Sequence, residues 1–423
     1  MNKIFISILI IGSVTIAHLP LSSTAYALGA EQSDKPKRKT QLVGPSVGKK
    51  VAKAFEAYGV EAEDGSNIDN ALTLLLDINA KKDYDIAFLN RFIGVMYAQK
   101  GEEKKSLEYL NKAIALDILN ESEHAESLKL VGDLQMQVQG YKDALIAYDA
   151  WMDFTGKSNA NVWLKIAQAN LELKQFAKVI PAADKAIAEL GDKVNQNPYV
   201  LKLNSYYERK MFKKCVEVLE TAVQVLPDVK LFWTQLGSFY AMIEDYPKSL
   251  ATMDLAYKKG LLDKESQIKM LANLYAQSEI PHKAAVLLEK HIDSGVVKRD
   301  DKNLFSLANS WHAAQHIDKA ASYYGELAKM TNLSKHYSKQ GMLLNQDEQF
   351  SKAIVALKKA IELGVKNPGR LNQSIAESYF YLEDYKQAYV YVKKAMKDPK
   401  SRRTAKGWVN FIKDTAARKK VSI

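Results

Sequence analysis

The sequence has little cysteine or proline. Its 423 residues include one cysteine, Cys215, so no intramolecular disulfide can form and only an intermolecular one is open to it. We expect this thiol to pack inside a helix pair. The 10 prolines are few for a chain of this length, which suits a helical protein. No cysteine stands directly after the apolar N-terminal segment, where a lipid would be attached, so lipidation is not supported.

Patterns typical of enzymes and metal sites are also missing. His312 and His316 are four residues apart, but the glutamate of a zinc protease and a third ligand are absent, and His316 falls at an expected turn. Residues 44–50 resemble a phosphate loop only superficially, because the glycine spacing is short and no strand precedes it. The acidic residues are scattered and offer no paired carboxylates. We predict no enzyme activity, no cofactor, no metal and no small-molecule substrate.

The first 27 residues follow a targeting pattern. Lys3 precedes an apolar stretch at residues 4–16, and Ala25 and Ala27 form a small-x-small cleavage pattern. The stretch is too short to span a bilayer, so we expect a cleaved signal peptide rather than a membrane anchor. Cleavage after Ala27 leaves a net charge of +10. We expect a periplasmic protein, and export disfavours nucleic acid as a partner.

The remainder of the chain repeats. Its clearest unit, WTQLGSFYAMIEDYPKSLATMDLA at Trp233–Ala256, follows the tetratricopeptide (TPR) pattern of two short helices. Gly237, Ser249 and Ala256 are small where the two helices come close, and Pro247 opens the second helix. A pair this short cannot bury its apolar face alone, so it implies neighbouring pairs.

The small position of the second helix can be followed through ten units. It is occupied by Ala71, Ser106, Ala144, Val179, Cys215, Ser249, Ala284, Ala320, Ala353 and Ala388. The intervals bracket the 34-residue TPR period. We predict an all-α TPR solenoid, a right-handed superhelix of about ten helix-turn-helix repeats over residues 51–400. A longer polar connection is expected at 191–198, and Pro181 should kink or shorten its helix.

The segments flanking the repeats are basic. We expect residues 28–50 to form an extended arm, either a solvated tether or a docking segment. The candidate docking residues are Lys37, Arg38, Lys39, Lys49 and Lys50. An acidic insertion at 61–67 marks the first unit as a terminal cap. Residues 401–423 are predicted to form a basic amphipathic capping helix and tail, with a membrane-surface role as the alternative.

Binding is the function that remains, and stacked TPR units commonly bind peptides with their first helices. The repeat frame assigns to this concave surface Lys129, Gln168, Asn204, Lys269, Asn273, Asn309, His312, Lys335 and Lys339. Four of these, on the units starting near residues 265 and 334, resemble the carboxylate clamp of chaperone-binding TPR domains. Ser306 replaces the clamp's middle asparagine, so the alternative is that the lysines lie on a solvated face by chance.

Several segments are more distinctive than the repeat pattern. They are RKTQLVGPSVGKKVAKAFEAY (38–58), WMDFTGK (151–157), NPYVLKLNSYYERK (197–210), LANLYAQ (271–277), KRDDKNL (298–304), KQGMLLNQDEQF (339–350) and GWVNFIKDTAARK (407–419). Together they resemble the periplasmic TPR protein associated with a class of TonB energy-transduction systems in marine-type gamma-proteobacteria. The resemblance covers the whole mature chain.

The resemblance implies a non-catalytic accessory that works with TonB, ExbB and ExbD. These proteins convert the inner-membrane proton gradient into pulling on outer-membrane receptors, typically for iron–siderophore or haem. The residues alone leave two other functions open. One is an envelope-assembly or cell-wall adaptor that contacts an anionic envelope surface, and the other is a regulator of an enzyme such as a polysaccharide synthase.

Overall fold

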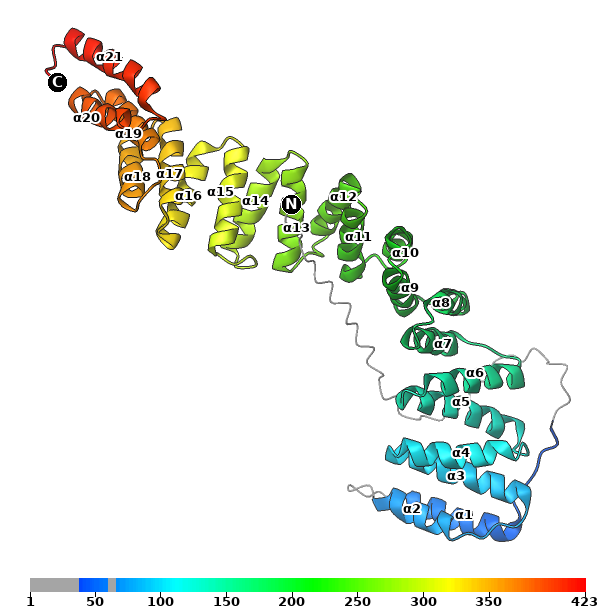
Figure 1. The fold of residues 1–423 in the computed structure, drawn as a ribbon. Coiled ribbons are helices and arrows are strands. Elements are labelled where there is room, and N and C mark those ends of the chain that lie inside the picture. Colours follow the sequence, from blue (N-terminus) through cyan, green and yellow to red (C-terminus); the bar gives the residue numbers. More distant parts are fainter. Residues whose placement is uncertain (1–37, 60–65) are drawn as a thin grey trace. The chain divides into compact units, whose positions relative to one another are not determined.

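The computed structural model describes residues 38–59 and 66–423 and divides into two units, Met1–Leu226 and Pro227–Ile423. The expected signal peptide, Lys37 and most of the acidic insertion lie outside the described residues. Every regular element within these residues is a helix (Figure 1). As predicted, the fold is all-α.

The helices of the first unit are α1 (Pro45–Tyr58), α2 (Ser66–Leu76), α3 (Asp83–Lys100), α4 (Glu103–Ala115), α5 (Glu121–Gln137), α6 (Tyr141–Thr155), α7 (Ala160–Glu172), α8 (Phe176–Leu190), α9 (Asn197–Glu208) and α10 (Phe212–Val225). Those of the second are α11 (Lys230–Met242), α12 (Tyr246–Lys258), α13 (Glu265–Gln277), α14 (Pro281–Asp293), α15 (Asp301–Ala313), α16 (Ile317–Thr331), α17 (Ser334–Gln346), α18 (Phe350–Glu362), α19 (Gly369–Tyr381), α20 (Tyr385–Met396) and α21 (Arg402–Arg418).

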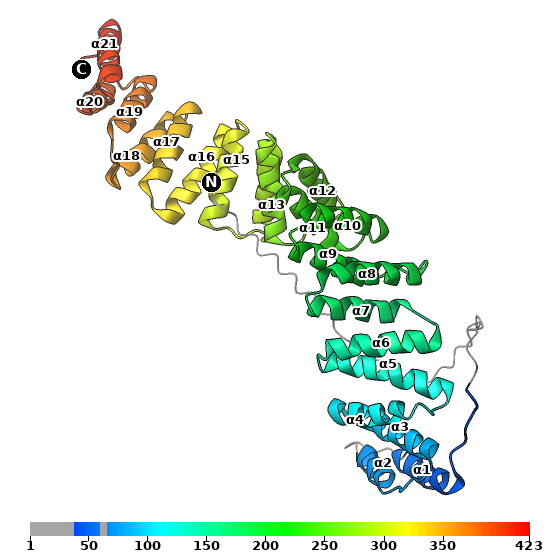
Figure 2. The ribbon, with the colours of Figure 1, turned by 45° about the vertical axis from the view of Figure 1, so that its right-hand side comes forward.

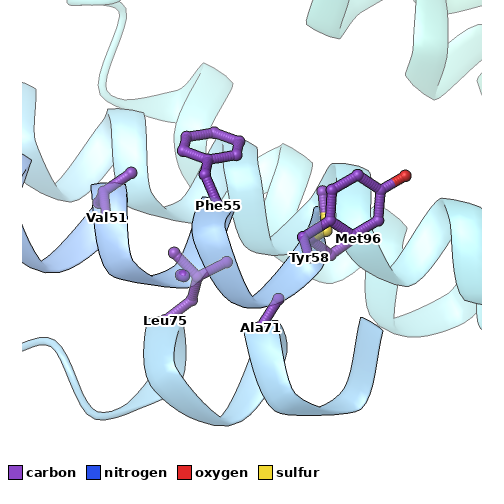
Figure 3. A pocket seen from close by; sticks show the side chains of 7 residues that line it. Val51, Phe55, Tyr58, Ala71, Leu75 and Met96 are labelled. Atoms are coloured by element: carbon purple, nitrogen blue, oxygen red, sulfur yellow. The ribbon is translucent and has the colours of Figure 1, made fainter. Parts of the chain in front are cut away.

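The helices up to α20 form ten pairs. Each odd-numbered helix, called helix A below, packs against the even-numbered helix that follows it, called helix B (Figure 2). In the first pair the interior is apolar, and Val51 of α1 and Leu75 of α2 are buried in one cluster with Met96 of α3 (Figure 3). Burial of such side chains against the next pair is what stabilises a solenoid.

The ten predicted small positions of helix B are all buried, with at most 1% of each side chain exposed. The hydroxyls of Ser106 and Ser249 donate to the carbonyl oxygens of Gly94 and Gly237 across the pair, each at 2.7 Å. Cys215 occupies the same position and is likewise buried, and burial raises the pKa of its thiol to about 12. Its predicted packing role is therefore confirmed.

The turns between helix A and helix B share a left-handed residue. Gly101 takes this conformation in the second pair. Eight later pairs place a non-glycine residue there, with φ between 56° and 64°: Gln139, Lys174, Lys210, Glu244, Glu279, Gln315, Glu348 and Glu383. In the sixth pair the N–H of Asp245 then reaches back to the carbonyl of Tyr240 at 2.9 Å, which closes the end of α11.

The predicted boundary between arm and solenoid at residue 51 was wrong, because α1 begins at Pro45. Proline suits the first turn of a helix, where its missing N–H breaks no bond. The preceding Gly44 N–H donates to Asp85 Oδ1 at 2.8 Å, which fixes the entry to the helix. Val47 is buried and extends the apolar face of α1 by one turn.

The described part of the arm, residues 38–44, is held against the first unit and is not a free tether. The Arg38 guanidinium donates to the carbonyl oxygens of Asp117 and Leu119 and lies 4.7 Å from the centre of the Phe154 ring. The Gln41 N–H donates to Asn120 Oδ1 at 2.8 Å. The repeat pattern could not predict this packing, because residues 38–44 lie outside the repeats.

Pro181 does not shorten α8, which runs unbroken from Phe176 to Leu190. A proline removes one hydrogen bond from a helix interior, but the residues after it, Ala182 and Ala183, are fully packed in the core of the first unit. The polar connection expected at 191–198 is present, since α9 begins only at Asn197.

The C-terminal helix α21 covers the last pair, as predicted. Ala405, Ile412 and Ala416 are fully buried against α20, and Val409 is nearly so. Phe411 is 48% exposed, although its ring contacts that of Phe380. Among the helices described, none is long and apolar enough to cross a membrane.

Candidate functional site

The candidate site is the helix-A face of the second unit, formed by neighbouring helices α13, α15, α17 and α19. Asn303 on α15 donates to Glu265 on α13 at 2.9 Å. Asn345 on α17 donates to the carbonyl of Ser374 on α19 at 3.0 Å. These bonds join α13 to α15 and α17 to α19, and the contacts of α15 with α17 described below complete the row.

Six of the nine predicted binding residues lie on this face: Lys269, Asn273, Asn309, His312, Lys335 and Lys339. The structure brings Lys339 and His312 together, with Lys339 Nζ 3.5 Å from His312 Nε2. Partial burial and the neighbouring ammonium group lower the pKa of His312. The imidazole is therefore neutral at pH 7, and the positive charge at this point belongs to Lys339.

The clamp positions are only partly available to a carboxylate. Lys269 Nζ already lies 3.5 Å from Glu265 Oε1 on its own helix. Ser306 donates to the carbonyl of Lys302 within α15, at 3.0 Å, so its hydroxyl does not replace the missing amide. Asn273 and Lys335 are exposed. An anionic ligand would therefore meet Lys335 and Lys339 before Lys269.

The other three predicted residues lie on the first unit. Lys129 Nζ is 6.0 Å from the centre of the Trp151 ring, and Gln168 is half-buried on α7. The side-chain oxygen of Asn204 is buried without a hydrogen-bond partner. The repeat frame predicted that all nine binding residues lie on a helix A. Three of them belong to the first unit and six to the second.

Several residues of this face were not singled out from the sequence. Phe305 is 45% exposed and meets the His336 ring edge-on at 6.1 Å. It lies four residues before Asn309, one helical turn, so the same repeat frame contained the signal. Lys302 and Arg370 are exposed at the second residue of α15 and α19, as Lys335 is on α17. The face thus combines a row of cations with an exposed ring.

Of the candidate arm residues, Lys39, Lys49 and Lys50 are exposed, and the last two lie on α1. Arg38 is engaged within the first unit through its contacts with Asp117 and Phe154. The exposed lysines remain open to a partner, whereas Arg38 would first have to leave its contacts.

The histidine pair does not share a helix face. His316 lies beyond the end of α15, as expected, and its ring contacts Trp311 at 5.0 Å and His282 at 5.2 Å. Across residues 38–59 and 66–423, no three His, Cys, Asp or Glu side chains are grouped to hold a metal ion.

Comparison with known proteins agrees with this architecture. A family model described as tetratricopeptide repeat matches residues 92–117, which cover the end of α3 and all of α4. The fold is a tetratricopeptide-repeat solenoid. Solenoids of this kind generally present an extended binding surface to other proteins. Among curated proteins, none matches this chain.

Solved structures similar to this solenoid share little sequence with it. YrrB, described as a TPR protein with an unusual peptide-binding site, is 18% identical, with 43% of this chain and 92% of that chain covered (TM-score 0.34). A TPR protein from Parabacteroides merdae is 11% identical, with coverages of 63% and 99% (TM-score 0.35). The Naa15/Naa10 complex with HypK is 13% identical, with coverages of 86% and 66% (TM-score 0.44).

Proposed function

We propose that this solenoid is a non-catalytic scaffold that binds a protein partner on the helix-A face of its second unit. The observation that carries the proposal is the row of exposed cations on that face. Lys302, Lys335 and Arg370 have no carboxylate partner within the described chain, and Phe305 adds an apolar contact beside them. An acidic, extended peptide fits such a surface.

We further propose that the partner belongs to a TonB-type energy-transduction complex in the periplasm. This rests on the resemblance of the non-repeat segments to an accessory of TonB, ExbB and ExbD. The scaffold would support uptake of iron–siderophore or haem without itself binding the cargo. A long helical solenoid suits an accessory because it offers separated sites for more than one protein.

Crosslinking in cells tests the partner. The full chain is crosslinked in place and purified, and the captured proteins are identified. Specific capture of TonB, ExbB or ExbD supports the transduction role. Recovery of only cell-wall fragments or an outer-membrane assembly machine would rule that role out.

A pair of double variants tests the face. Lys269→Ala with Lys339→Ala should weaken binding of the captured partner by about tenfold. Lys339 would lose one charge-assisted hydrogen bond, worth on the order of 1.5 kcal/mol, whereas Lys269 is already paired with Glu265. Lys248→Ala with Lys352→Ala removes the same charge from exposed positions on α12 and α18 and should leave the affinity unchanged. Equal losses in both pairs would show that the face makes no specific contact.

The alternative is an envelope-assembly or cell-wall adaptor that is not linked to TonB. It is favoured by the excess of 32 Lys and Arg over 21 Asp and Glu in Pro227–Ile423. Attraction to an anionic polymer would fall steeply with salt and would be indifferent to which lysines are removed. Binding with that behaviour selects this alternative.

A further inference from the structure

One cavity of the second unit is lined by none of the candidate binding residues of the helix-A face. It is a solvent-open cleft of about 710 Å³ between α18, the loop that leads into α19, and the end of α20. Four of its lining residues are Lys358, Lys366, Lys394 and Lys397. We call it the α18–α20 cleft. Its volume falls within the range of small-ligand pockets.

Positive charge exceeds negative charge in this cleft, because four lysines and two acidic residues line it. Its two acidic lining residues are already occupied: Glu362 pairs with Lys359, outside the cleft, at 2.6 Å. Asp398 accepts the backbone N–H groups of Gly369 at 3.1 Å and of Lys400 at 2.9 Å. Each of the four lining lysines therefore lacks a carboxylate partner in the described chain.

Two tyrosines hold one of the lysines in place. Lys358 Nζ donates to the Tyr379 hydroxyl at 2.7 Å and lies 5.3 Å from the centre of the Tyr391 ring. Lys394 Nζ lies 4.3 Å from that same ring. Tyr391 lines the cleft, so two ammonium groups converge on an aromatic wall. This arrangement provides both charge and a flat apolar surface.

We propose that the α18–α20 cleft binds a phosphate ester. Four lysines line the cleft and supply several point charges for the oxygens of a phosphate dianion, and lysine is a common ligand of phosphate groups. The organic part of the ligand would lie against Tyr391. Because Asp398 occupies the N–H of Gly369 at the start of α19, the site depends on its side chains and not on a helix N-terminus.

Titration of the full chain with pyrophosphate, followed by calorimetry, tests the site. Lys394→Gln with Lys397→Gln should weaken binding by about tenfold or more, as expected for the loss of two charge-assisted contacts. Lys386→Gln with Lys406→Gln makes the same charge change at exposed positions of α20 and α21 that do not line the cleft. This control should bind as the unaltered chain does.

Two results would overturn the proposal. They are no pyrophosphate binding below about 1 mM and equal weakening in both double variants.

Vesicles of phosphatidylcholine with phosphatidic acid distinguish two sources of the ligand. If the unaltered chain binds them and the cleft variant does not, the phosphate belongs to a lipid headgroup. Pyrophosphate binding without vesicle binding assigns a soluble phosphate ester. Lys269→Ala and Lys339→Ala do not change any residue that lines the α18–α20 cleft. Failure of the phosphate proposal can therefore be told apart from failure of the partner proposal.

Discussion

Met1–Leu226 carries 28 Lys and Arg against 28 Asp and Glu, whereas Pro227–Ile423 carries 32 against 21. The whole net charge of +11 therefore belongs to the second unit. Within that unit, residues 386–420 alone hold 12 basic residues and two acidic ones. Both units are built from helix pairs of the same kind, so this difference in net charge does not follow from the fold.

The helix-A residues of the first unit pair with one another. Arg91 on α3 meets Glu126 on α5 at 2.5 Å, and Lys165 on α7 meets Asp133 on α5 at 2.7 Å. On the second unit, Lys302 of α15 and Lys335 and Lys339 of α17 form no ion pair with a carboxylate among the described residues. The first unit thus neutralises its own face, and the second leaves its face open to an anionic partner.

The comparison separates two kinds of position. The compact residue at the small position of helix B is fixed by packing and is fully or almost fully buried in both units. The exposed helix-A positions are free to vary, and there the units differ. We expect core substitutions to act alike in the two units and charge substitutions to act oppositely.

The largest effect is expected from the matched core pair Leu110→Ala and Leu357→Ala. Each leucine is fully buried on a helix B and covers the glycine of its helix A, Gly94 or Gly341. Removing either side chain leaves a cavity and should lower the free energy of unfolding by about 2–5 kcal/mol. Denaturant unfolding of both variants measures the losses. A loss below about 1 kcal/mol in one unit alone would show that the two are not packed alike.

This shared packing is the part of the molecule that the sequence predicted best. A residue such as Ser249 must be small because two helices cross there, and that constraint recurs at every repeat. The helix-A face of Lys335 and Lys339 followed from the same frame. The contacts of these two lysines could not be predicted in this way. The repeat frame determines on which side of a helix a residue lies, but not which group its long side chain contacts.

Features without a period escaped prediction. The start of α1 at Pro45 and the anchoring of Arg38 depend on contacts with helices about 40 to 80 residues away. The α18–α20 cleft is built partly from two loops, so no spacing in the sequence marks it. Glu265 beside Lys269 was visible as an i,i+4 pair, yet only the structure shows that it also holds Asn303.

A smaller effect of opposite sign is expected from charge reversal in the first turn of a helix A. Lys335 is the second residue of α17, where no acidic residue offsets the positive end of the helix. Lys335→Glu should raise the free energy of unfolding by about 0.3–1 kcal/mol while weakening partner binding. Glu121→Lys, in the first turn of α5, should lower it by a similar amount. Thermal unfolding at low salt compares them. A loss of stability in Lys335→Glu would show that the first turn of α17 does not need the negative charge that the first turn of α5 has.

The smallest expected effect concerns a carboxyl group on the helix-A face. Burial raises the pKa of Glu377 above its usual value of 4.5, and a hydrogen bond from Gln373 at 3.0 Å offsets this only in part. The folded state therefore binds the proton more tightly than the unfolded chain does. The resulting stability is fully present below pH 4.5 and is lost as the pH rises through the higher folded value.

Glutamine does not ionise, so Glu377→Gln removes the loss of stability that follows ionisation of Glu377. The free energy of unfolding of this variant, relative to that of the unaltered chain, should therefore be higher at pH 7 than at pH 4. Asp149 of the first unit is the comparison, because burial and the nearby Asp153 also raise its pKa, while Lys185 opposes the shift. Asp149→Asn should change stability with pH in the same direction. Denaturant unfolding across this range measures both variants. In the contrary outcome, Glu377→Gln shows no pH-dependent gain while Asp149→Asn does. That result would mean that a cationic side chain stabilises the ionised form of Glu377, so that the cationic surface extends onto α19.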